Sequence, residues 1–374
     1  MAHAADELAG ASAQRPSVST LHGEGDVLRD KLIGCLLGTA CGDACGLRFE
    51  GLDPATIERA LAERPLAPRF FLGRGLVSDD TELAAAVVEA LCVSREPEAF
   101  ARAFAWRMRL WFVALPPALG LATARACLRL CLGAGPTRAG IRSAGNGAAM
   151  RVAALGVVAR DEDHADALAT ACARVTHTDP RAVEGARFVA CWAHRLARGD
   201  AGSVAELVER FTDEVMRERS AAALALAQAG ATPAALRERL TCPKGPSGFI
   251  VETIPAVIYC LTRHADDPRA AVEAAARLGG DTDTIAAIVG GLAGARHGAS
   301  AWPRAWLDRI VDWPWRPSTL TALAVRLADG QRPPPFARRW PLALARNAVF
   351  LALAVAVVLR RWIDAIASRV RATR

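Results

Sequence analysis

The sequence predicts an all-α protein, and three observations support this prediction. Of its 374 residues, 52% are hydrophobic, with many Ala and Leu, and only 6% are aromatic; such a composition favours helices. No sustained alternation of β-branched residues is present, and no Asn-Gly turn joins two such runs. Helical segments instead follow one another along most of the chain, which is long enough for one large domain or two small ones.

The helical segments are separated by proline and glycine clusters, such as Pro116-Pro117 and the loop at 133–147. The first segment carries Ile33, Leu36 and Leu37 on one side, as an amphipathic helix does. The predicted helices span 27–42, 81–93, 97–113, 119–132, 163–175, 180–198, 202–228, 232–240, 249–264 and 283–296.

The amino-acid composition of the chain changes at both ends. Residues 1–26 are rich in Ala, Ser, Gly and charge, which predicts a disordered lead. The main domain is expected to occupy residues 27–328. Residues 329–374 are expected to form a Pro/Arg linker followed by a hydrophobic C-terminal helix.

An acidic cluster opens the helix near residue 283, in the stretch "GGDTDTIAAIVGGLAGARHG" (279–298). Helix capping is one interpretation, because Asp and Thr accept hydrogen bonds from a first turn. Capping needs one or two such residues, however, and the stretch has Asp281, Thr282, Asp283 and Thr284. The later glycines, each costing a helix up to about 1 kcal/mol, predict that another backbone comes close to this helix.

A second cluster of the same kind lies roughly 200 residues earlier, in "VSDDTELAAAVVEAL" (77–91). Ser78, Asp79, Asp80 and Thr81 precede an alanine-rich helix. Oxygen ligands of this kind suit Mg²⁺ or Mn²⁺, whereas zinc prefers Cys or His. Each cluster alone favours capping, but the pair together favours a metal site, because two facing clusters can hold two ions.

Three further loops combine glycine with polar residues. "GTACGDACGLRFEG" leads to Glu50, "RSAGNGAAMRVAALG" carries Ser143 and a Gly-Asn-Gly turn, and "THTDP" places His177 before a helix start. Taken singly, Glu50 is interpreted as a surface residue, the Gly-Asn-Gly segment as an ordinary turn and His177 as a residue near a helix cap. None of the three is specific by itself.

The five motifs, in this order, resemble those of the ADP-ribosylglycohydrolase family, over roughly Leu32 to Gly298. The resemblance implies a compact, orthogonal all-α helical bundle with a central metal cleft. It also implies two Mg²⁺ or Mn²⁺ ions as cofactors. The positions that match the family's metal motifs are Ser78, Asp79, Asp80, Asp281, Asp283 and Thr284.

The resemblance also implies roles for the remaining motifs. Glu50 matches the family's glutamate after the first helix, so Glu50 and Asp80 are expected to be catalytic. The expected substrate-binding residues, around the diphosphate and ribose, are Ser143, Gly145, Asn146, Gly147 and His177. One departure is Ala144, where some relatives carry an aromatic residue, so any stacking contact must come from elsewhere or be missing.

The sequence leaves two functions open. The first is a hydrolase that removes ADP-ribose from a protein side chain, of arginine or serine type, or from a small ADP-ribosylated molecule. Nearby carboxylates would favour the oxocarbenium-like charge that forms at the ribose anomeric carbon. The second is a non-catalytic ADP-ribose-binding or structural protein on the same scaffold. All the expected ligand positions carry oxygen donors, which favours the enzyme.

Charge and cysteine usage restrict the other properties of the chain. The formal charge of +7 comes from scattered basic residues with no aromatic-interleaved patch, so no nucleic-acid partner is expected. The ten cysteines include no C-x-x-C pair with matching histidines and are expected to be free thiols. The N-terminus shows no apolar signal region, which favours a cytoplasmic location. A monomer is the expected state.

The tail, "RRWPLALARNAVFLALAVAVVLRRW" (338–362), leaves two interpretations. Every residue from Ala348 to Leu359 is apolar, but Arg346 and Asn347 interrupt the roughly 20 residues that a membrane span needs. A helix apolar all round is not expected to lie exposed on a soluble domain. A packed C-terminal helix is favoured over a membrane anchor, in which Arg346 would snorkel outward. Membrane association through residues 341–359 stays open.

Overall fold

Helices make up the regular structure of the chain, as predicted. The computed structural model describes residues 18–117, 119–200, 204–335, 341–353 and 355–356. These residues form α-helices, short 3₁₀ helices (η) and isolated β-bridges, and no β-sheet occurs among them. All ten cysteines are free, and most are buried.

The bounds of the elements are as follows. The first half of the chain contains α1 (Val18–Gly46), η1 (Leu47–Phe49), α2 (Pro54–Glu63), α3 (Asp79–Leu91), α4 (Pro97–Val113), α5 (Leu121–Cys131), η2 (Asn146–Arg151), α6 (Ala153–Val158), α7 (Glu162–Arg174) and α8 (Pro180–Ala197). The second half contains α9 (Val204–Glu209), α10 (Glu214–Gln228), α11 (Pro233–Arg239), α12 (Ile250–Arg263), α13 (Pro268–Leu278), α14 (Thr282–His297), η3 (Ala299–Ala301), α15 (Arg304–Leu307) and α16 (Pro317–Ala328). A further helix, which we call the C-terminal helix, spans Pro341–Leu353.

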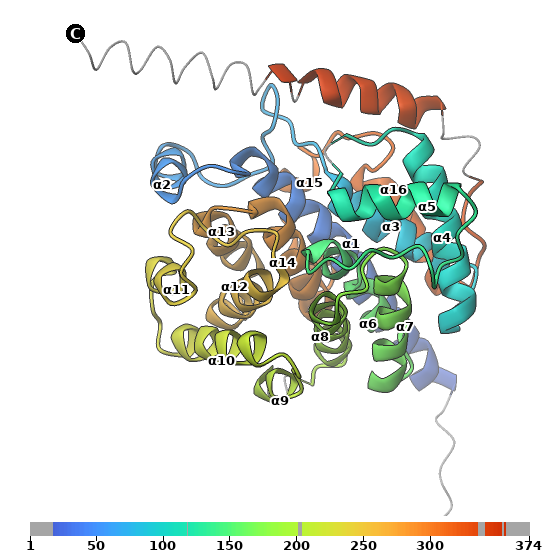
Figure 1. The fold of residues 1–374 in the computed structure, drawn as a ribbon, viewed down its shortest axis with the longest axis horizontal. Coiled ribbons are helices and arrows are strands. Elements are labelled where there is room, and N and C mark those ends of the chain that lie inside the picture. The colour runs from blue at the N-terminus through green and yellow to red at the C-terminus, as the bar shows by residue number, and fades with distance from the viewer. Residues whose placement is uncertain (1–17, 118, 201–203, 336–340, 354, 357–374) are drawn as a thin grey trace, which may run out of the picture.

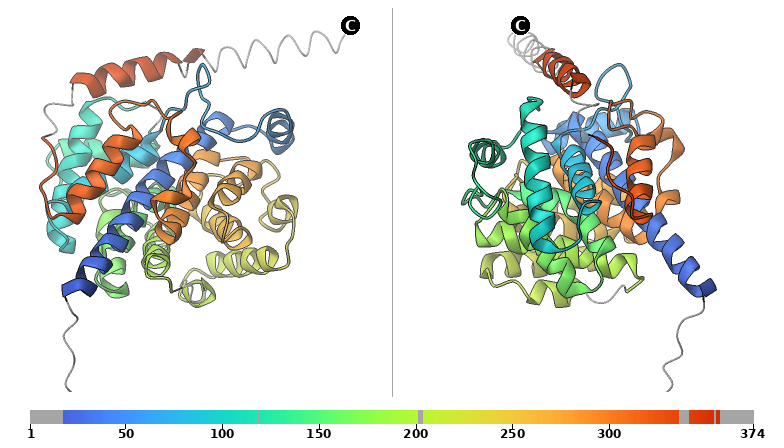
Figure 2. Two further views of the ribbon diagram at one scale, coloured as in Figure 1. Left: turned by 180° about the vertical axis from the view of Figure 1, so that it is seen from behind. Right: turned by 90° about the vertical axis from the view of Figure 1, so that its right-hand side faces the viewer.

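Helix α1 passes through the middle of the molecule, with α10–α13 on one side and α3–α5 on the other (Figure 1). The C-terminal helix lies across one end, above α4 and α16, in both of the opposed views (Figures 1 and 2). Within the described residues, Gly25–Phe49 is long and apolar enough to cross a membrane, but its apolar window is almost entirely buried in the protein. We therefore interpret α1 as the core helix of the domain.

Helices α1 and α14 lie against each other with almost no side chains between them, which confirms the close backbone approach predicted from the glycines. A Cβ added to Gly38 would lie 2.1 Å from the carbonyl oxygen of Gly290, and one added to Gly42 would lie 1.9 Å from that of Ala286. The pairing is antiparallel, because Gly34 lies near Gly298 and Gly46 near Thr282. The end of α1 is thereby fixed at the start of α14. We call this contact the α1–α14 seam.

The structure differs from the predicted helices in several places. Helix α1 begins at Val18 instead of residue 27, because extending an existing helix costs little per residue; the rest of the predicted lead, residues 1–17, lies outside the described residues. The single helix predicted over 202–228 is two helices, since Asp213 caps a new one by accepting a hydrogen bond from the Met216 N–H. Helices α2, α13 and α16 were not predicted; each begins with a proline at its first turn.

Candidate active site

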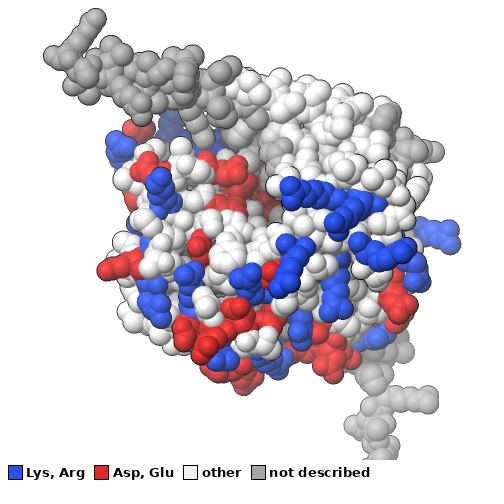
Figure 3. All heavy atoms as spheres, viewed as in Figure 1, with Lys and Arg blue, Asp and Glu red and all other residues white. Residues whose placement is uncertain are grey.

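The predicted site residues meet in one cleft of about 1000 Å³. All of them except Asp80 line it, although they come from loops and helix ends spread over more than 230 residues, and Asp80 lies buried directly behind Ser78. The predicted residues on the cleft wall are Glu50, Ser78, Asp79, Ser143, Gly145, Asn146, Gly147, His177, Asp281, Asp283 and Thr284. Figure 3 shows acidic side chains gathered in a hollow on this face of the molecule.

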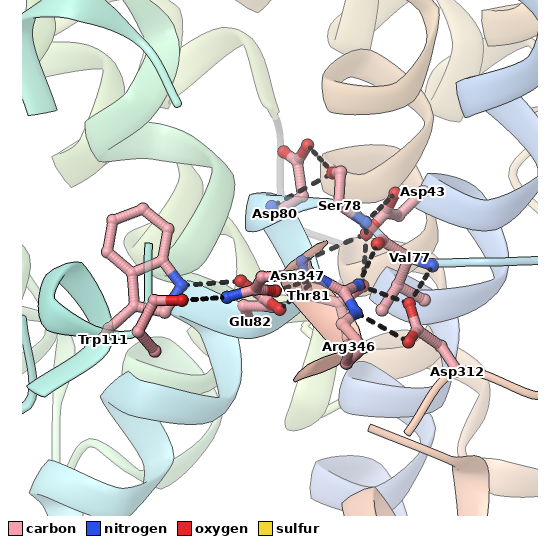
Figure 4. Close-up of polar contacts among 11 residues, drawn as sticks. Asp43, Val77, Ser78, Asp80, Thr81, Glu82, Trp111, Asp312, Arg346 and Asn347 are labelled. Atoms are coloured by element: carbon pink, nitrogen blue, oxygen red, sulfur yellow. Dashed lines mark hydrogen bonds and ion pairs between the residues drawn. The ribbon is translucent and has the colours of Figure 1, made fainter. Parts of the chain in front are cut away.

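The start of α3 is capped by Ser78 and by a residue of α1. The Ser78 hydroxyl accepts a hydrogen bond from the Asp80 N–H (3.2 Å) and donates one to Asp80 Oδ2 (2.9 Å). The buried carboxylate of Asp43 accepts hydrogen bonds from the N–H groups of Ser78 (2.9 Å) and Thr81 (3.2 Å), as Figure 4 shows. Capping therefore accounts for Ser78 and Asp43, but it does not account for Asp79.

The start of α14 is not capped by its first carboxylate. Asp281 occupies the N-cap position but makes no side-chain capping bond, and its Oδ2 accepts a hydrogen bond from Asn146 Nδ2 at 2.7 Å. Thr284 Oγ1 donates to Asp80 Oδ2 at 3.4 Å and joins the two acidic clusters. The geometry thus favours a shared polar site over two independent helix caps.

Burial and mutual repulsion raise the pKa values of the clustered carboxyl groups. Burial is the largest cause at Asp79, followed by the charges of Glu82 and Asp43, and together they raise its pKa to about 8. Burial and the neighbouring carboxylates also raise the pKa values of Asp80 and Asp283 well above their usual range. Cations bound beside these carboxylates would favour their charged forms and lower their pKa values again.

The residues present fit hard divalent cations. Asp80 Oδ1 is buried and has no hydrogen-bond partner, and the surrounding donors are carboxylate and hydroxyl oxygens, which Mg²⁺ and Mn²⁺ prefer. In the described part of the chain, no three His, Cys, Asp or Glu side chains are close enough to form a ready-made metal site. The oxygen donors around Asp80 also include the hydroxyls of Ser78 and Thr284, and the carboxylates must adjust to take up an ion.

The Gly-Asn-Gly loop lines the cleft beside the acidic clusters and is held by hydrogen bonds from two directions. Asn146 donates to Thr253 Oγ1 (3.1 Å) as well as to Asp281, and its N–H bonds the carbonyl of Gly248 (2.9 Å). On the side of the protein interior, the fully buried Arg151 donates a hydrogen bond to the carbonyl of Gly147 at 2.6 Å. The loop backbone is therefore rigid where it faces the cleft.

His177 lies beside this loop as a neutral imidazole. Burial, and then the charge of Arg151, lower its pKa to about 3. Arg151 donates to Thr176 Oγ1 (2.7 Å), and the same hydroxyl lies 2.8 Å from His177 Nδ1. This arrangement favours a Thr176 hydroxyl that donates to Nδ1, which leaves the ring proton on Nε2, close to Gly145 and Gly147.

Helix η1 directly follows α1, and Glu50 is the next residue after η1. Glu50 is exposed and lines the cleft. The next residue, Gly51, donates its N–H to the carbonyl of Gly280 (3.0 Å), so this loop is fixed to the start of α14. The Glu50 charge also contributes to the raised pKa of Asp283, which places the two carboxyl groups in the same electrostatic environment.

Sequence reasoning missed the residues that position the site. Asp43 reads as one polar residue in a Cys- and Gly-rich helix, and Arg151 as one of many arginines. Both are fully buried charged residues, a rare situation that needs polar partners. The signal available was their place in the quoted loops, Asp43 in "GTACGDACGLRFEG" and Arg151 in "RSAGNGAAMRVAALG".

The C-terminal helix also reaches the cleft, through the residues that interrupt its apolar run. Arg346 forms an ion pair with Glu82 of α3 (2.8 Å) and with Asp312, and it donates to the carbonyl of Val77 (2.7 Å; Figure 4). Asn347 donates to the carbonyl of Ala114 at 2.7 Å. Arg346 thus points into the protein, where two buried carboxylates attract it, as in the favoured packed helix and unlike the outward arginine of a membrane anchor.

Phe350 is a third residue through which the C-terminal helix contacts the protein, and its ring lines the cleft. Its ring stacks on Phe70 with centroids 5.7 Å apart, and both rings line the cleft. Because Ala144 supplies no ring beside the Gly-Asn-Gly loop, Phe70 and Phe350 are the aromatic rings that the described cleft wall offers to a bound base.

Comparisons with known proteins identify the family of the chain. The family model described as ADP-ribosylglycohydrolase matches residues 24–335. An uncharacterised protein of Archaeoglobus fulgidus is 31% identical over 296 residues, covering 76% of this chain and 93% of that protein. The ADP-ribosyl-[dinitrogen reductase] glycohydrolase of Rhodospirillum rubrum is 27% identical, covering 76% and 92%. A solved structure described as an ADP-ribosylglycohydrolase-related protein complex has a TM-score of 0.57 and 29% identity, covering 82% of this chain and 99% of that one.

Proposed function

We propose that this chain, which belongs to the ADP-ribosylglycohydrolase family and is a glycohydrolase, uses Mg²⁺ or Mn²⁺ to release ADP-ribose from an ADP-ribosylated protein side chain or small molecule. The observation that carries the proposal is the contact between the two acidic clusters, Thr284 Oγ1 to Asp80 Oδ2, at the end of a cleft that also holds the Gly-Asn-Gly loop. The volume of the cleft suits a ligand of the size of ADP-ribose.

The ions would be held by the oxygen atoms of the two clusters. In this proposal the ligands are Ser78, Asp79, Asp80, Asp281, Asp283 and Thr284. When bound, such ions supply positive charge that orients hydroxyl oxygens and lowers the pKa of a nearby water.

The Gly-Asn-Gly loop and His177, next to these oxygen atoms, would bind the diphosphate and the ribose. The glycines of the loop let backbone N–H groups approach phosphate oxygens without a Cβ in the way. His177 stays neutral, so its Nε2–H is a hydrogen-bond donor that carries no charge and needs no counter-ion. Ser143, which lines the cleft and accepts a hydrogen bond from the Gly145 N–H, holds the entrance of the loop.

Glu50 is the proposed proton carrier, because it lies on the exposed side of the cleft and is fixed to the start of α14 through Gly51. Changing Glu50 to Gln preserves shape and removes the charge. We expect turnover to fall by about 10²–10⁴-fold, the usual contribution of general acid–base groups, with ADP-ribose affinity nearly unchanged. Weaker binding with normal single-turnover rates would make Glu50 a gate instead.

The direct test is to incubate the protein with ADP-ribosyl-arginine and ADP-ribosyl-serine peptides, in Mg²⁺ and in EDTA, and to measure the ADP-ribose released. We expect release in Mg²⁺ from one peptide class, and none in EDTA or from Asp283→Ala. Full activity in EDTA would contradict the metal-dependent mechanism. Tight ADP-ribose binding without release from either peptide would favour the alternative of a non-catalytic ADP-ribose-binding protein.

A further inference from the structure

The C-terminal helix has its polar residues inside and its apolar residues outside. In Pro341–Leu353 the polar side chains are Arg346 and Asn347, and both face the protein. Leu342, Val349 and Leu351 face outward and are 52%, 59% and 55% exposed. A surface helix of a water-soluble protein has the opposite arrangement.

The two loops that contact this helix also expose leucine. Phe70, which stacks on Phe350, belongs to a tight turn whose next residues include Leu72, 86% exposed. Ala114, which accepts the bond from Asn347, is followed by Leu115, 69% exposed. Both leucines have left-handed backbones, with φ of +47° and +54°, which is uncommon for residues other than glycine.

These three segments form one surface, which we call the apolar face: residues 71–72, residue 115 and the outer side of the C-terminal helix. In Figure 1 the loop that follows α2 rises to the C-terminal helix, and in Figure 3 the upper right of the molecule lacks charged side chains, unlike the lower half. A contiguous exposed apolar surface of this kind marks an interaction site.

Arginines lie next to the turn that carries Leu72. Arg69 and Arg74 flank the turn that carries Leu72, and Arg309 donates to the carbonyl of Gly73 within that turn. Exposed apolar residues with basic side chains beside them are typical of surfaces that bind an anionic membrane.

We propose that the apolar face binds the surface of a lipid bilayer that contains anionic lipids. The apolar side chains enter the boundary between headgroups and acyl chains, and the arginines contact the phosphates. A second copy of the chain is a poorer occupant, because residues 71–72, 115 and 341–353 include no acidic side chain that could pair with the arginines of an identical face. The cleft borders this surface through Phe70 and Phe350, so substrate binds close to the bilayer.

The test is cosedimentation of the full-length protein with vesicles of phosphatidylcholine, with and without phosphatidylglycerol. We expect binding to the anionic vesicles and weaker binding to the neutral ones. Val349→Asp combined with Leu351→Asp, and separately Leu72→Asp, should each lower vesicle affinity by roughly tenfold or more. Val215→Asp is the matched control: Val215 is similarly exposed at the start of α10, on the opposite side of the molecule, and its change should leave binding intact.

Circular dichroism and thermal unfolding would establish that each variant is folded, and the vesicle assay needs no hydrolytic activity, so its result is independent of the proposed function. Protein that stays in the supernatant with both vesicle types would overturn the proposal. So would concentration-dependent dimerisation that Leu351→Asp abolishes, in the absence of vesicle binding, because it would assign the apolar face to a second copy. Equal loss of binding in Val215→Asp would also count against it.

Discussion

The α1–α14 seam and the C-terminal helix both border the acidic end of the cleft, but they contact the protein through different groups. At the seam, backbone meets backbone: a Cβ at Gly34, Gly38 or Gly42 would overlap a carbonyl group of α14 or of the residue that follows it. The C-terminal helix is held by a few long side chains, chiefly Arg346, Asn347 and Phe350.

This difference indicates that the α1–α14 seam belongs to the core of the fold, whereas the C-terminal helix is attached to its surface. The seam brings Asp43 to the start of α3 and Gly46 to Thr282, whose hydroxyl donates to the Gly46 carbonyl at 2.9 Å. The C-terminal helix forms an ion pair with α3, between Arg346 and Glu82. We therefore expect changes at the seam to disrupt folding and changes at the C-terminal helix to leave a folded domain with an altered cleft.

The largest effect is expected at the seam, for Gly42→Val. Its Cβ would lie 1.9 Å from the Ala286 carbonyl oxygen, so the helices must separate, at a cost of at least about 3 kcal/mol. We expect little soluble protein and a strongly lowered unfolding temperature in thermal denaturation. Gly25→Val in the same helix is the control, because nothing lies within 4 Å of its Cβ. Equal effects of the two changes would show that helix propensity, not the backbone contact, limits glycine replacement in α1.

The glycine spacing shows how far the sequence could predict the seam. Glycines at intervals of three and four in 290–298 indicated that a backbone approaches, but not which one. The partner, with Gly34, Gly38, Gly42 and Gly46 at intervals of four, is visible in the sequence once both helices are compared. The split between α9 and α10 was harder to predict, because residues 210–213 differ little in hydropathy from their neighbours and the break depends on one capping aspartate.

The second prediction concerns the clustered carboxyl groups of the cleft, Asp79, Asp80 and Asp283. Their pKa values are higher in the folded protein than in the unfolded chain, where Asp titrates near ~3.9. Such groups contribute stability at low pH and lose it as pH rises, here from about pH 4 to the folded pKa of Asp79, about 8. In EDTA, the unfolding temperature should fall over this range, and Mg²⁺ should restore it.

The variants Asp80→Asn and Asp283→Asn remove one charge each from this cluster. We expect both to be inactive, to unfold at least about 2 °C higher than wild type in EDTA at pH 8, and to respond less to Mg²⁺. Asp266→Asn, at an exposed surface ion pair, is the control that should change neither property. If the Asn variants are instead less stable than wild type in EDTA, the carboxylates stabilise the fold without a cation and the metal site loses its main support.

The residues that line the candidate site could be predicted from the sequence, but the buried charged residues that hold them in place could not. Eleven of the twelve predicted residues carry side-chain oxygen atoms or are glycines, the twelfth is His177, and all but Asp80 line one cleft. The roles of Asp43 and Arg346 could not be read from the sequence, because their partners lie 34 or more residues away, at Ser78, Glu82 and Asp312. Hydrophobic periodicity in the sequence predicts which side of a helix is apolar, but it does not predict which distant residues will form ion pairs or hydrogen bonds with a buried charged side chain.

The smallest effect is expected at the C-terminal helix, for Arg346→Met. Removing the arginine leaves Glu82 and Asp312 buried without their cation, which is costly for the docked state, so we expect the helix to detach. The domain held by the seam should stay folded, with kcat/KM lowered by about tenfold or less, because Phe350 leaves the cleft wall while the carboxylates stay. Trypsin should then cleave around the C-terminal helix much faster than in wild type. Combining Arg346→Met with Glu82→Gln should partly restore protection, since Gln carries no charge to bury, whereas Arg304→Met, at an exposed ion pair, should change nothing. If Arg346→Met instead unfolds the whole domain, the C-terminal helix is part of the core, and its distinction from the seam is wrong.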